Sequence, residues 1–517
     1  MQVTSMRHRG IRAVASAIVA GAVISTAVGC APAAQNEPST PVPDSLAVST
    51  LRQPSAFNVT SLSEGNDAYI WSSIYDRLLV KDADGNLQPN AATGWEYSSD
   101  GLTLTVKLRE DMKFSNGDQV TSQDVKATID NLKSKPGPHT DKVVLITSVD
   151  TPDDFTVVIN LSQPDPSLLH NLAAVVGVIA DADNVGAETA ATNPVGSGPY
   201  TLDTSATTQG SVYTLKKRED YWNADAYPFK TFTVKVISDS TAAENALRSG
   251  ELNVAMTGPA SKAALEAQNY GITSIDAVAV GVIKIVDRAG AMQPALADPR
   301  VRKAINMAFD REQIVKNINQ GVGSPTQQVF SPAGDAFVEE AQKTYDFDVE
   351  GAKQLMAEAG YPDGFSVTMP SLVFTTPFEP TIKQALENIG IKVTWEPIPP
   401  QNTTSAVGGG KYPMVFWFDG LNIPARMLKT HYTPTAFLNP MRNEDPKLNA
   451  LLEKLNKTVD PADQKPIYQD ITRFVTENAW DAPVFYSGAL VATAPGYEYK
   501  GTVANQFSSI QLFGVSK

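Results

Sequence analysis

The sequence has very few of the residues that form covalent or metal-bound cores. Cys30 is the only cysteine among 517 residues, so no intramolecular disulfide can form. Histidine is also rare, and His139, His170 and His431 lie far apart, with no cysteine partner other than Cys30. Because no metal-ligand spacing results, we expect neither a bound metal nor a cofactor.

Long hydrophobic runs are scarce too, and the one candidate lies near the N-terminus. Three arginines between residues 7 and 12 precede an uncharged stretch, 13–28, that is shorter than the roughly 20 residues of a membrane-spanning helix. The stretch leads into "AVGC", which resembles a bacterial lipobox. We therefore expect residues 1–29 to be a lipoprotein signal peptide and Cys30 to be acylated. An uncleaved membrane anchor and a secreted protein with a chance cysteine are the alternatives.

Basic residues are in deficit. Without residues 1–29 the chain has 39 Lys and Arg against 56 Asp and Glu, a formal charge of −17. Such an acidic surface argues against nucleic acid and anionic lipid as partners. The remaining length suggests about three domains, and a hydrophobic content of 42% is enough for their cores. Residues 30–45, rich in Pro, Ala and Ser, predict a flexible tether.

Strict alternation of apolar and polar residues predicts strands in the first half of the chain. Residues 102–109 and 155–161 both show it. Between them, Thr121 and Asp124 have the spacing of a capping box that begins a helix. Residues 76–194 are therefore expected to form an α+β module with an antiparallel sheet.

The second half has the periodicity of an α/β domain. Apolar residues recur with helical spacing after Asp298, Asp310 and Asp348, and Asp-Pro pairs at 445–446 and 460–461 predict two further helix starts. Residues 365–371, 380–390 and 391–398 follow the order strand, helix, strand, which predicts a parallel βαβ unit. The short apolar run at 414–418 predicts a buried strand.

Motifs of catalysis are missing. The sequence contains no G-x-S-x-G, and "GGGK" at 408–411 continues into Tyr412 and Pro413 instead of a phosphate-loop helix. We therefore expect a protein that is not an enzyme. The alternative is a surface lipoprotein hydrolase or structural factor on the same scaffold, because a fold does not determine a function.

Several stretches in a fixed order resemble the peptide/nickel-type extracytoplasmic solute-binding proteins of ABC importers, family 5. They are "IYDRLLVKDADG" (74–85), "GSGPYTL" (196–202), "REDYW" (218–222), "ALRSGELNVA" (246–255) and "DPRVRKAINMAFDREQIV" (298–315). The resemblance covers about residues 46–510. It implies an α/β, three-lobed, periplasmic-binding-protein-like fold, in which two α/β lobes close on a cleft and an extra α+β lobe is added.

The resemblance also implies the lobes and the partners. Lobe I would comprise residues 46–75, 195–285 and 485–517, lobe II residues 76–194, and lobe III residues 286–484. The protein would be a monomer, lipid-anchored at the extracytoplasmic face of the cell membrane, that captures a small solute, an oligopeptide above other solutes. Its partners would be this ligand and the permease subunits of an ABC transporter.

Ligand-binding residues follow from the same resemblance. Glu64, Gly65 and Asn66 fall where lobe I presents groups to the ligand, and Gly281 falls where an aromatic residue is common, which implies more room. In lobe III, "WFDG" gives Trp417, Phe418, Asp419 and Gly420. This is one residue shorter than the family's W-x-x-D segment, whose aspartate pairs with a peptide's amino terminus. Asp419 could instead be an aspartate at a strand end, and one of the two aromatic residues could pack within lobe III.

Overall fold

The computed structural model describes residues 43–65 and 68–516. The predicted signal peptide, Cys30 and Asn66 lie outside the described residues. Within the described ranges, no helix is both long enough and apolar enough to cross a membrane. The first strand, β1, begins at Ser45, which is the last residue assigned to the tether.

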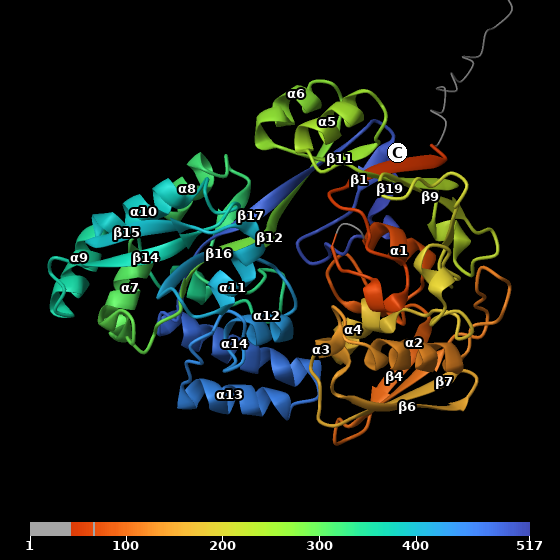
Figure 1. Cartoon of the computed structure of the whole chain (residues 1–517), viewed down its shortest axis with the longest axis horizontal. Helices are drawn as coiled ribbons and strands as arrows, with labels where there is room; N and C mark the ends of the chain where they lie inside the picture. The colour runs from red at the N-terminus through yellow and green to blue at the C-terminus, as the bar shows by residue number, and fades with distance from the viewer. Residues whose placement is uncertain (1–42, 66–67, 517) are drawn as a thin grey trace, which may run out of the picture. The chain divides into compact units, whose positions relative to one another are not determined.

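One large sheet connects the N-terminal and C-terminal halves of the described chain (Figure 1). Its strand order is β16-β12-β17-β11-β1-β10-β9-β8, with β13 paired to β17. β1 runs parallel to β10 and β11, and the other pairs are antiparallel. In the same order, the strands are Met414–Gly420, Gly271–Ile285, Asp481–Thr493, Val254–Thr257, Ser45–Thr50, Thr231–Val236, Val212–Lys217 and Tyr200–Leu202, with β13 at Gly323–Pro325.

Two long neighbouring strands, β12 and β17, carry this sheet from lobe I into lobe III. Their pairing is irregular at two places: between Ile275 and Ala279, and between Gly281 and Val282. At the first place, Ile275 pairs with Ala489 and Ala279 pairs with Ser487. Four residue steps along β12 therefore lie opposite two along β17, so β12 contains a bulge. β12 ends at Ile285, and its residues 279–285 pair with β16 on one side and with β17 on the other.

Lobe II is the predicted α+β module. Its sheet has the order β4-β5-β7-β6, all antiparallel. The capping box is present, because Asp124 accepts a hydrogen bond from the Thr121 backbone N–H at 2.8 Å. The elements of this module are β2 (Leu79–Lys81), β3 (Leu87–Pro89), β4 (Ala92–Tyr97), β5 (Thr103–Leu108), α2 (Ser122–Ser134), α3 (Thr140–Val143), β6 (Ile146–Asp153), β7 (Thr156–Leu161) and α4 (Leu168–Leu172).

Lobe III contains the predicted parallel βαβ unit, β14-α10-β15. Asp310, Asp348, Asp445 and Asp460 accept hydrogen bonds from backbone N–H groups at the starts of their helices, as predicted. The elements of the lobe are α7 (Pro299–Met307), α8 (Arg311–Asn317), α9 (Val349–Glu358), β14 (Phe365–Ser371), α10 (Glu379–Asn388), β15 (Ile391–Pro397), α11 (Thr403–Gly408), α12 (Pro424–His431), α13 (Pro446–Asn456) and α14 (Pro461–Glu477).

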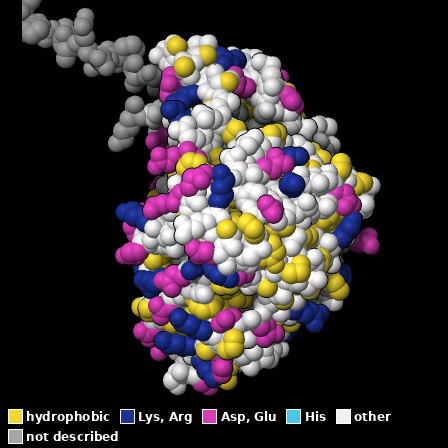
Figure 2. Space-filling model, turned by 90° about the vertical axis from the view of Figure 1, so that its left-hand side faces the viewer, with side chains coloured by type: hydrophobic (Ala, Val, Ile, Leu, Met, Phe, Trp, Pro, Cys, Tyr) yellow, Lys and Arg dark blue, Asp and Glu magenta, His cyan; other side chains and the backbone are white. Residues whose placement is uncertain are grey.

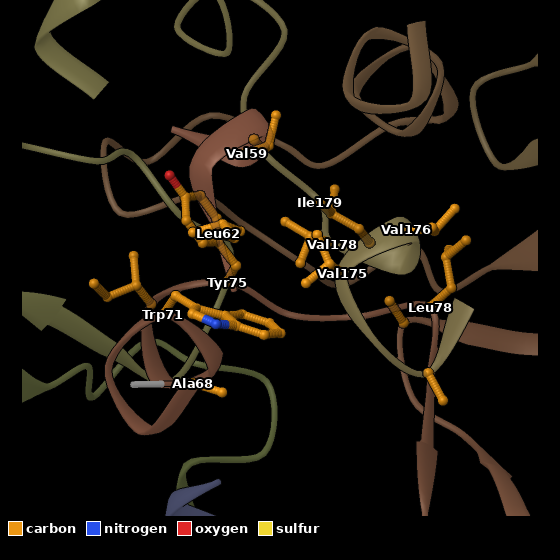
Figure 3. Close-up of a cluster of buried hydrophobic side chains, with 14 of the residues drawn as sticks. Val59, Leu62, Ala68, Trp71, Tyr75, Leu78, Val175, Val176, Val178 and Ile179 are labelled. Carbon is orange, nitrogen blue, oxygen red and sulfur yellow. The ribbon is translucent and has the colours of Figure 1, made fainter. Parts of the chain in front are cut away.

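Lobes I and II share one hydrophobic core. Figure 3 shows part of it, where side chains from residues 59–62 and 68–78 meet those of residues 175–179. Trp71, on α1 (Ala68–Ile74), is 1% exposed, as expected for a core residue. Lobe III packs around other clusters, which also include residues of β12 and β17. Because packed cores resist deformation, lobes I and II should move as one body against lobe III. The exact lobe boundaries stay predictions.

Two smaller groups complete lobe I. Helices α5 (Ser240–Arg248) and α6 (Lys262–Glu266) lie beside β11 and β12 and enclose a small core of their own. Strands β18 (Tyr497–Tyr499) and β19 (Phe513–Val515) form a C-terminal hairpin whose aromatic residues contact the shared core. On the face drawn in Figure 2, acidic and basic side chains are interspersed.

Candidate functional site

A cavity of about 500 Å³ is lined by all three predicted lobes. Lobe I contributes Glu64, Gly65 and residues of the segment 503–512. Lobe II contributes residues within 77–86, 141–142 and 167–174, and lobe III contributes residues within 331–335 and 421–429. The volume lies inside the range of about 300–1,000 Å³ that is typical of small-ligand sites.

Three side chains form a basic wall of this cavity: Arg77, Lys81 and His170. Arg77 is buried; its Nη1 donates to Ala173 O at 2.9 Å, and its guanidinium lies 4.3 Å from the ring centroid of Phe507. Burial lowers the pKa of Lys81, against the attraction of Glu64. Burial, and then the charge of Lys81, lower the pKa of His170 to about 3, so the imidazole is neutral at pH 7.

The opposite wall belongs to α12, which has Pro424 at its first position. Arg426 and Lys429 lie three residues apart and so project from one face of the helix. Arg426 Nη1 donates to Asp141 Oδ2 of lobe II, and Lys429 Nζ lies 3.9 Å from Asp165 Oδ1. These pairs join lobe III to lobe II. Arg426 and Asp141 are both about half exposed, so their pair contributes only about 0–1 kcal/mol. Asp165 is buried, in contrast to its partner Lys429.

The floor of the cavity touches the bulge of β12. Gln506, in the C-terminal segment, donates from Nε2 to Ala277 O at 2.6 Å. From lobe III, the Leu421 N–H donates to Val278 O at 3.0 Å. Both Gln506 and Leu421 line the cavity, so groups from the two sides of the cavity hold the same bulge.

Two of the predicted ligand residues line the cavity. Glu64 Oε1 accepts a hydrogen bond from Lys142 Nζ at 2.5 Å. Gly65 has a φ of +128°, a conformation that glycine adopts without strain. Asn66 lies outside the described residues. The role of these residues in ligand binding stays a prediction.

Asp419 lies on β16 and keeps 23% of its side chain exposed. It does not line the cavity. Its Oδ2 is 2.7 Å from Nε2 of the fully buried His431, whose Nδ1 is 3.2 Å from Lys284 Nζ. Because the lysine ammonium can only donate, His431 Nδ1 accepts and Nε2–H donates to Asp419. Asp419 thus already has a partner inside lobe III, and its role towards a ligand amine stays a prediction.

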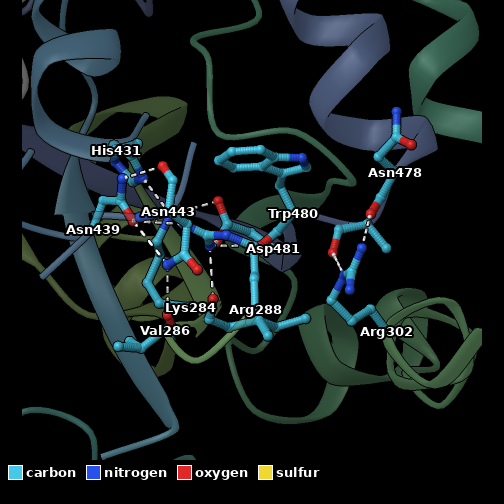
Figure 4. A network of polar contacts seen from close by, with 12 residues as sticks. Lys284, Val286, Arg288, Arg302, His431, Asn439, Asn443, Asn478, Trp480 and Asp481 are labelled. Atoms are coloured by element: carbon cyan, nitrogen blue, oxygen red, sulfur yellow. Dashed lines mark hydrogen bonds and ion pairs between the residues drawn. The ribbon is translucent and has the colours of Figure 1, made fainter. Parts of the chain in front are cut away.

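The polar contacts of Asp419 and His431 continue through Lys284 to further buried residues of the lobe (Figure 4). Lys284, on β12, donates to Asp481 Oδ2 on β17 at 2.5 Å, and Arg288 Nη1 lies 3.6 Å from Asp481 Oδ1. Lys284 is 0% exposed and Asp481 is 5% exposed. Burial lowers the pKa of Lys284 to about 8, against the attraction of Asp481. The pKa of Asp481 would be raised by burial, but the charges of Lys284 and Arg288 hold it below its usual value.

The remaining predicted residues do not line the cavity. Trp417 packs against Phe374 and Phe437, and Phe418 packs against Phe378, Phe416 and Phe485 on the other face of β16. Gly420 is the exposed end of that strand.

The extra room expected at Gly281 does not exist. A Cβ at this buried position would lie 2.9 Å from the ring of Phe485. The space that a larger residue would occupy is already filled by a ring from β17. Whether Gly281 contributes to ligand binding stays a prediction.

Sequence reasoning missed the basic wall and the residues of α12. Lys81 ends a three-residue strand, and His170 lies on a five-residue helix, so neither is part of a recognisable motif. Across the described ranges, no group of three or more His, Cys, Asp or Glu side chains is arranged to hold a metal ion.

The model of the bacterial extracellular solute-binding proteins, family 5 middle region, matches residues 86–439. Glutathione-binding proteins GsiB of Salmonella typhi and of Escherichia coli O1:K1 are 30% identical over 348 and 349 residues. Each match covers 65% of this chain and 67% of the relative.

Solved structures share the fold over nearly the whole chain. The ABC transporter substrate-binding protein CtaP of Listeria monocytogenes gives a TM-score of 0.79 at 22% identity, covering 92% of this chain and 100% of the other. DppA of Helicobacter pylori in complex with the peptide STSA gives a TM-score of 0.72 at 22% identity, covering 92% of this chain and 98% of the other. AppA of Bacillus subtilis in complex with a nonapeptide gives a TM-score of 0.70 at 21% identity, covering 92% of this chain and 99% of the other. The predicted α/β, multi-lobed fold is therefore confirmed.

Proposed function

Because this chain belongs to family 5 of the bacterial extracellular solute-binding proteins, we propose that it captures a peptide and delivers it to the permease of an ABC importer. The observation that carries the proposal is the cavity between the three lobes, with an exposed ion pair across it, Arg426–Asp141, that is weak enough to open. The relatives named for glutathione and the neighbours bound to peptides support the ligand class.

Ligand-induced stabilisation tests the peptide assignment. A ligand present at 100 times its Kd raises the free energy of unfolding by about 2.7 kcal/mol. We expect short peptides, and glutathione among them, to raise the Tm of the purified protein, and native mass spectrometry of protein purified without denaturation to show the mass of a retained ligand. If no peptide acts while a solute of another class does, the ligand is not a peptide, but the receptor function stands.

The proposal includes an acyl anchor at Cys30 and a monomeric receptor outside the cytoplasm. A thioether-linked diacyl chain would hold the protein at the membrane surface. We expect the wild type to fractionate with membranes, Cys30→Ser to be released from them, and intact-mass analysis to place the mature N-terminus at Cys30. A mature chain that begins elsewhere would contradict the anchor.

A further inference from the structure

A second contact joins lobe II to lobe III outside the ligand cavity. The turn between α13 and α14, residues 457–460, packs against the β4–β5 hairpin and the segment 164–169 of lobe II (Figure 1). A gap of about 20 Å³ separates the two surfaces. Small-ligand sites have volumes of about 300 Å³ or more, so this contact is an interface and not a second ligand site. None of the described residues that line the gap also lines the cavity.

At this interface a side chain of lobe III occupies a position where lobe II has none. Gly101 is buried at the end of the β4–β5 hairpin and has a φ of +69°, a conformation that glycine adopts without strain. A Cβ at Gly101 would overlap Cγ2 of Val459 and would lie 3.4 Å from Cγ of Pro164. The methyl group of Val459 therefore fills a notch, which we define by Gly101 and Pro164, and the two lobes are complementary in shape here.

Both surfaces are held by hydrogen bonds within their own lobe. Gln464, which is 6% exposed, donates from Nε2 to Thr458 O at 2.8 Å and so fixes the turn to α14. In lobe II, Asp165 Oδ1 accepts hydrogen bonds from the N–H and the Oγ of Ser167 at 2.9 and 2.6 Å. Because neither surface has to become ordered when the lobes meet, little conformational entropy opposes the contact.

The interface is connected to the ligand cavity through one segment of lobe II. Asp165 lines the gap, whereas Ser167, two residues further along the chain, lines the cavity. Lys429 also lines the cavity, and its Nζ lies 3.9 Å from Asp165 Oδ1. Since lobes I and II share one core, this contact forms or breaks only when that body closes on lobe III or opens from it.

We propose that the α13–α14 turn is a latch, in which Val459 docks into the notch of lobe II and prolongs the closed state of the receptor. The inference rests on the proposed function and adds a device that controls release of the solute. In the open form Val459 and the notch would both face water, so burial of the methyl groups favours closure. A contact that favours the binding-competent state raises the apparent affinity without touching the ligand.

Dissociation rates of variants at Val459 test the latch, with glutathione and a tripeptide library as the probes. Val459→Ala removes buried methyl groups and should accelerate dissociation about three- to tenfold. Val459→Asp places a carboxylate in the gap that Asp165 lines, and dissociation should accelerate about tenfold or more. The association rate should stay within about twofold of wild type, because the open form is unchanged. The control Val373→Ala alters a lobe III side chain that is 67% exposed and should change neither rate.

A distance measurement shows whether the variants open the lobes. Because Cys30 is the only cysteine, a Cys30→Ser background that carries Gln123→Cys on α2 and Lys454→Cys on α13 accepts spin labels at two positions only. Both positions are exposed. In pulsed electron paramagnetic resonance with saturating probe, Val459→Asp should keep a population at longer distances that wild type lacks. A Tm of the unliganded variant near that of wild type establishes that it is folded.

The outcomes separate the latch from the function on which it rests. Unchanged dissociation in both Val459 variants, or an equal acceleration in Val373→Ala, overturns the latch and leaves the peptide receptor intact. Slower association together with a lowered Tm also overturns it, because the turn would then support the fold of lobe III. If no probe binds, the peptide assignment fails, and the label distances of the unliganded protein decide. A shift to longer distances in Val459→Asp supports the latch, and identical distributions overturn it.

Discussion

Removing the charge of Asp481 should destabilise lobe III strongly. Asp481 Oδ2 lies 2.5 Å from Lys284 Nζ, and the lysine side chain is 0% exposed. Arg288, 3.6 Å from the other carboxylate oxygen, is 5% exposed as a side chain. In Asp481→Asn two cations would remain in the interior with no counter-ion in contact. Neither side chain can reach water without breaking the surrounding packing.

The expected loss follows from the burial of the pair. Breaking a fully buried ion pair by removing one partner costs about 3–5 kcal/mol, whereas an exposed pair contributes about 0–1 kcal/mol. The exposed pair Glu453–Lys457, at 2.6 Å, is a matched control, because the same charge is removed from a similar distance. We therefore expect Asp481→Asn to lose about 3–5 kcal/mol and Glu453→Gln less than 1 kcal/mol.

Urea unfolding followed by tryptophan fluorescence measures the difference, since Trp480 lies beside Arg288, with 4.4 Å from its guanidinium carbon to the ring centroid. The double variant Asp481→Asn/Lys284→Met also removes the buried lysine charge and should recover at least half of the loss. A loss below 1 kcal/mol in the single variant, or no recovery in the double variant, would refute the view that an uncompensated buried charge determines the effect.

Three further changes have defined outcomes. Arg426→Met removes an ion pair between lobes II and III that is about half exposed, so ligand dissociation measured by stopped flow should accelerate less than tenfold, and a larger change would contradict a weak contact. His170→Gln should reduce the dependence of the free energy of unfolding on pH. Between the folded pKa of about 3 and the unfolded pKa of about 6.5, the imidazole binds a proton only in the unfolded wild type. Urea titrations should therefore show that wild type loses about 2 kcal/mol more of its free energy of unfolding than the variant between pH 7 and pH 5. Gly281→Ala forces a methyl group against the ring of Phe485 and should cost about 1–3 kcal/mol in unfolding experiments, whereas Gly94→Ala, where a Cβ meets open space, should cost less than 0.5 kcal/mol.

Local signals in the sequence predicted the elements well. Asp445 and Asp460 are followed by proline, and the two residues cap α13 and α14 because a side-chain oxygen and the missing N–H of proline both suit a first helical turn. Strict alternation predicted β5, and the order of apolar segments predicted the parallel pair β14-β15. In each case the determining atoms lie within a few residues of one another.

The cavity could not be predicted in the same way. Lys81 and Lys429 line the same space although almost 350 residues separate them in the chain. The protonation and the partners of such side chains depend on how the folded chain buries them, and a short sequence pattern does not contain that information. Asp419 illustrates the same limit, because its local segment indicated a carboxylate available to a ligand, while the tertiary structure gives it a buried imidazole as partner.

The bulge of β12 places an irregular stretch of the connection between the lobes next to the cavity. A paired two-stranded ribbon resists stretching but yields to twisting, and an irregular register concentrates the twist. Gln506, through its side-chain amide, and Leu421, through its backbone N–H, donate hydrogen bonds to consecutive carbonyls of the bulge. A ligand that displaced either residue would therefore act directly on the two-stranded connection between the lobes, with no intermediate element.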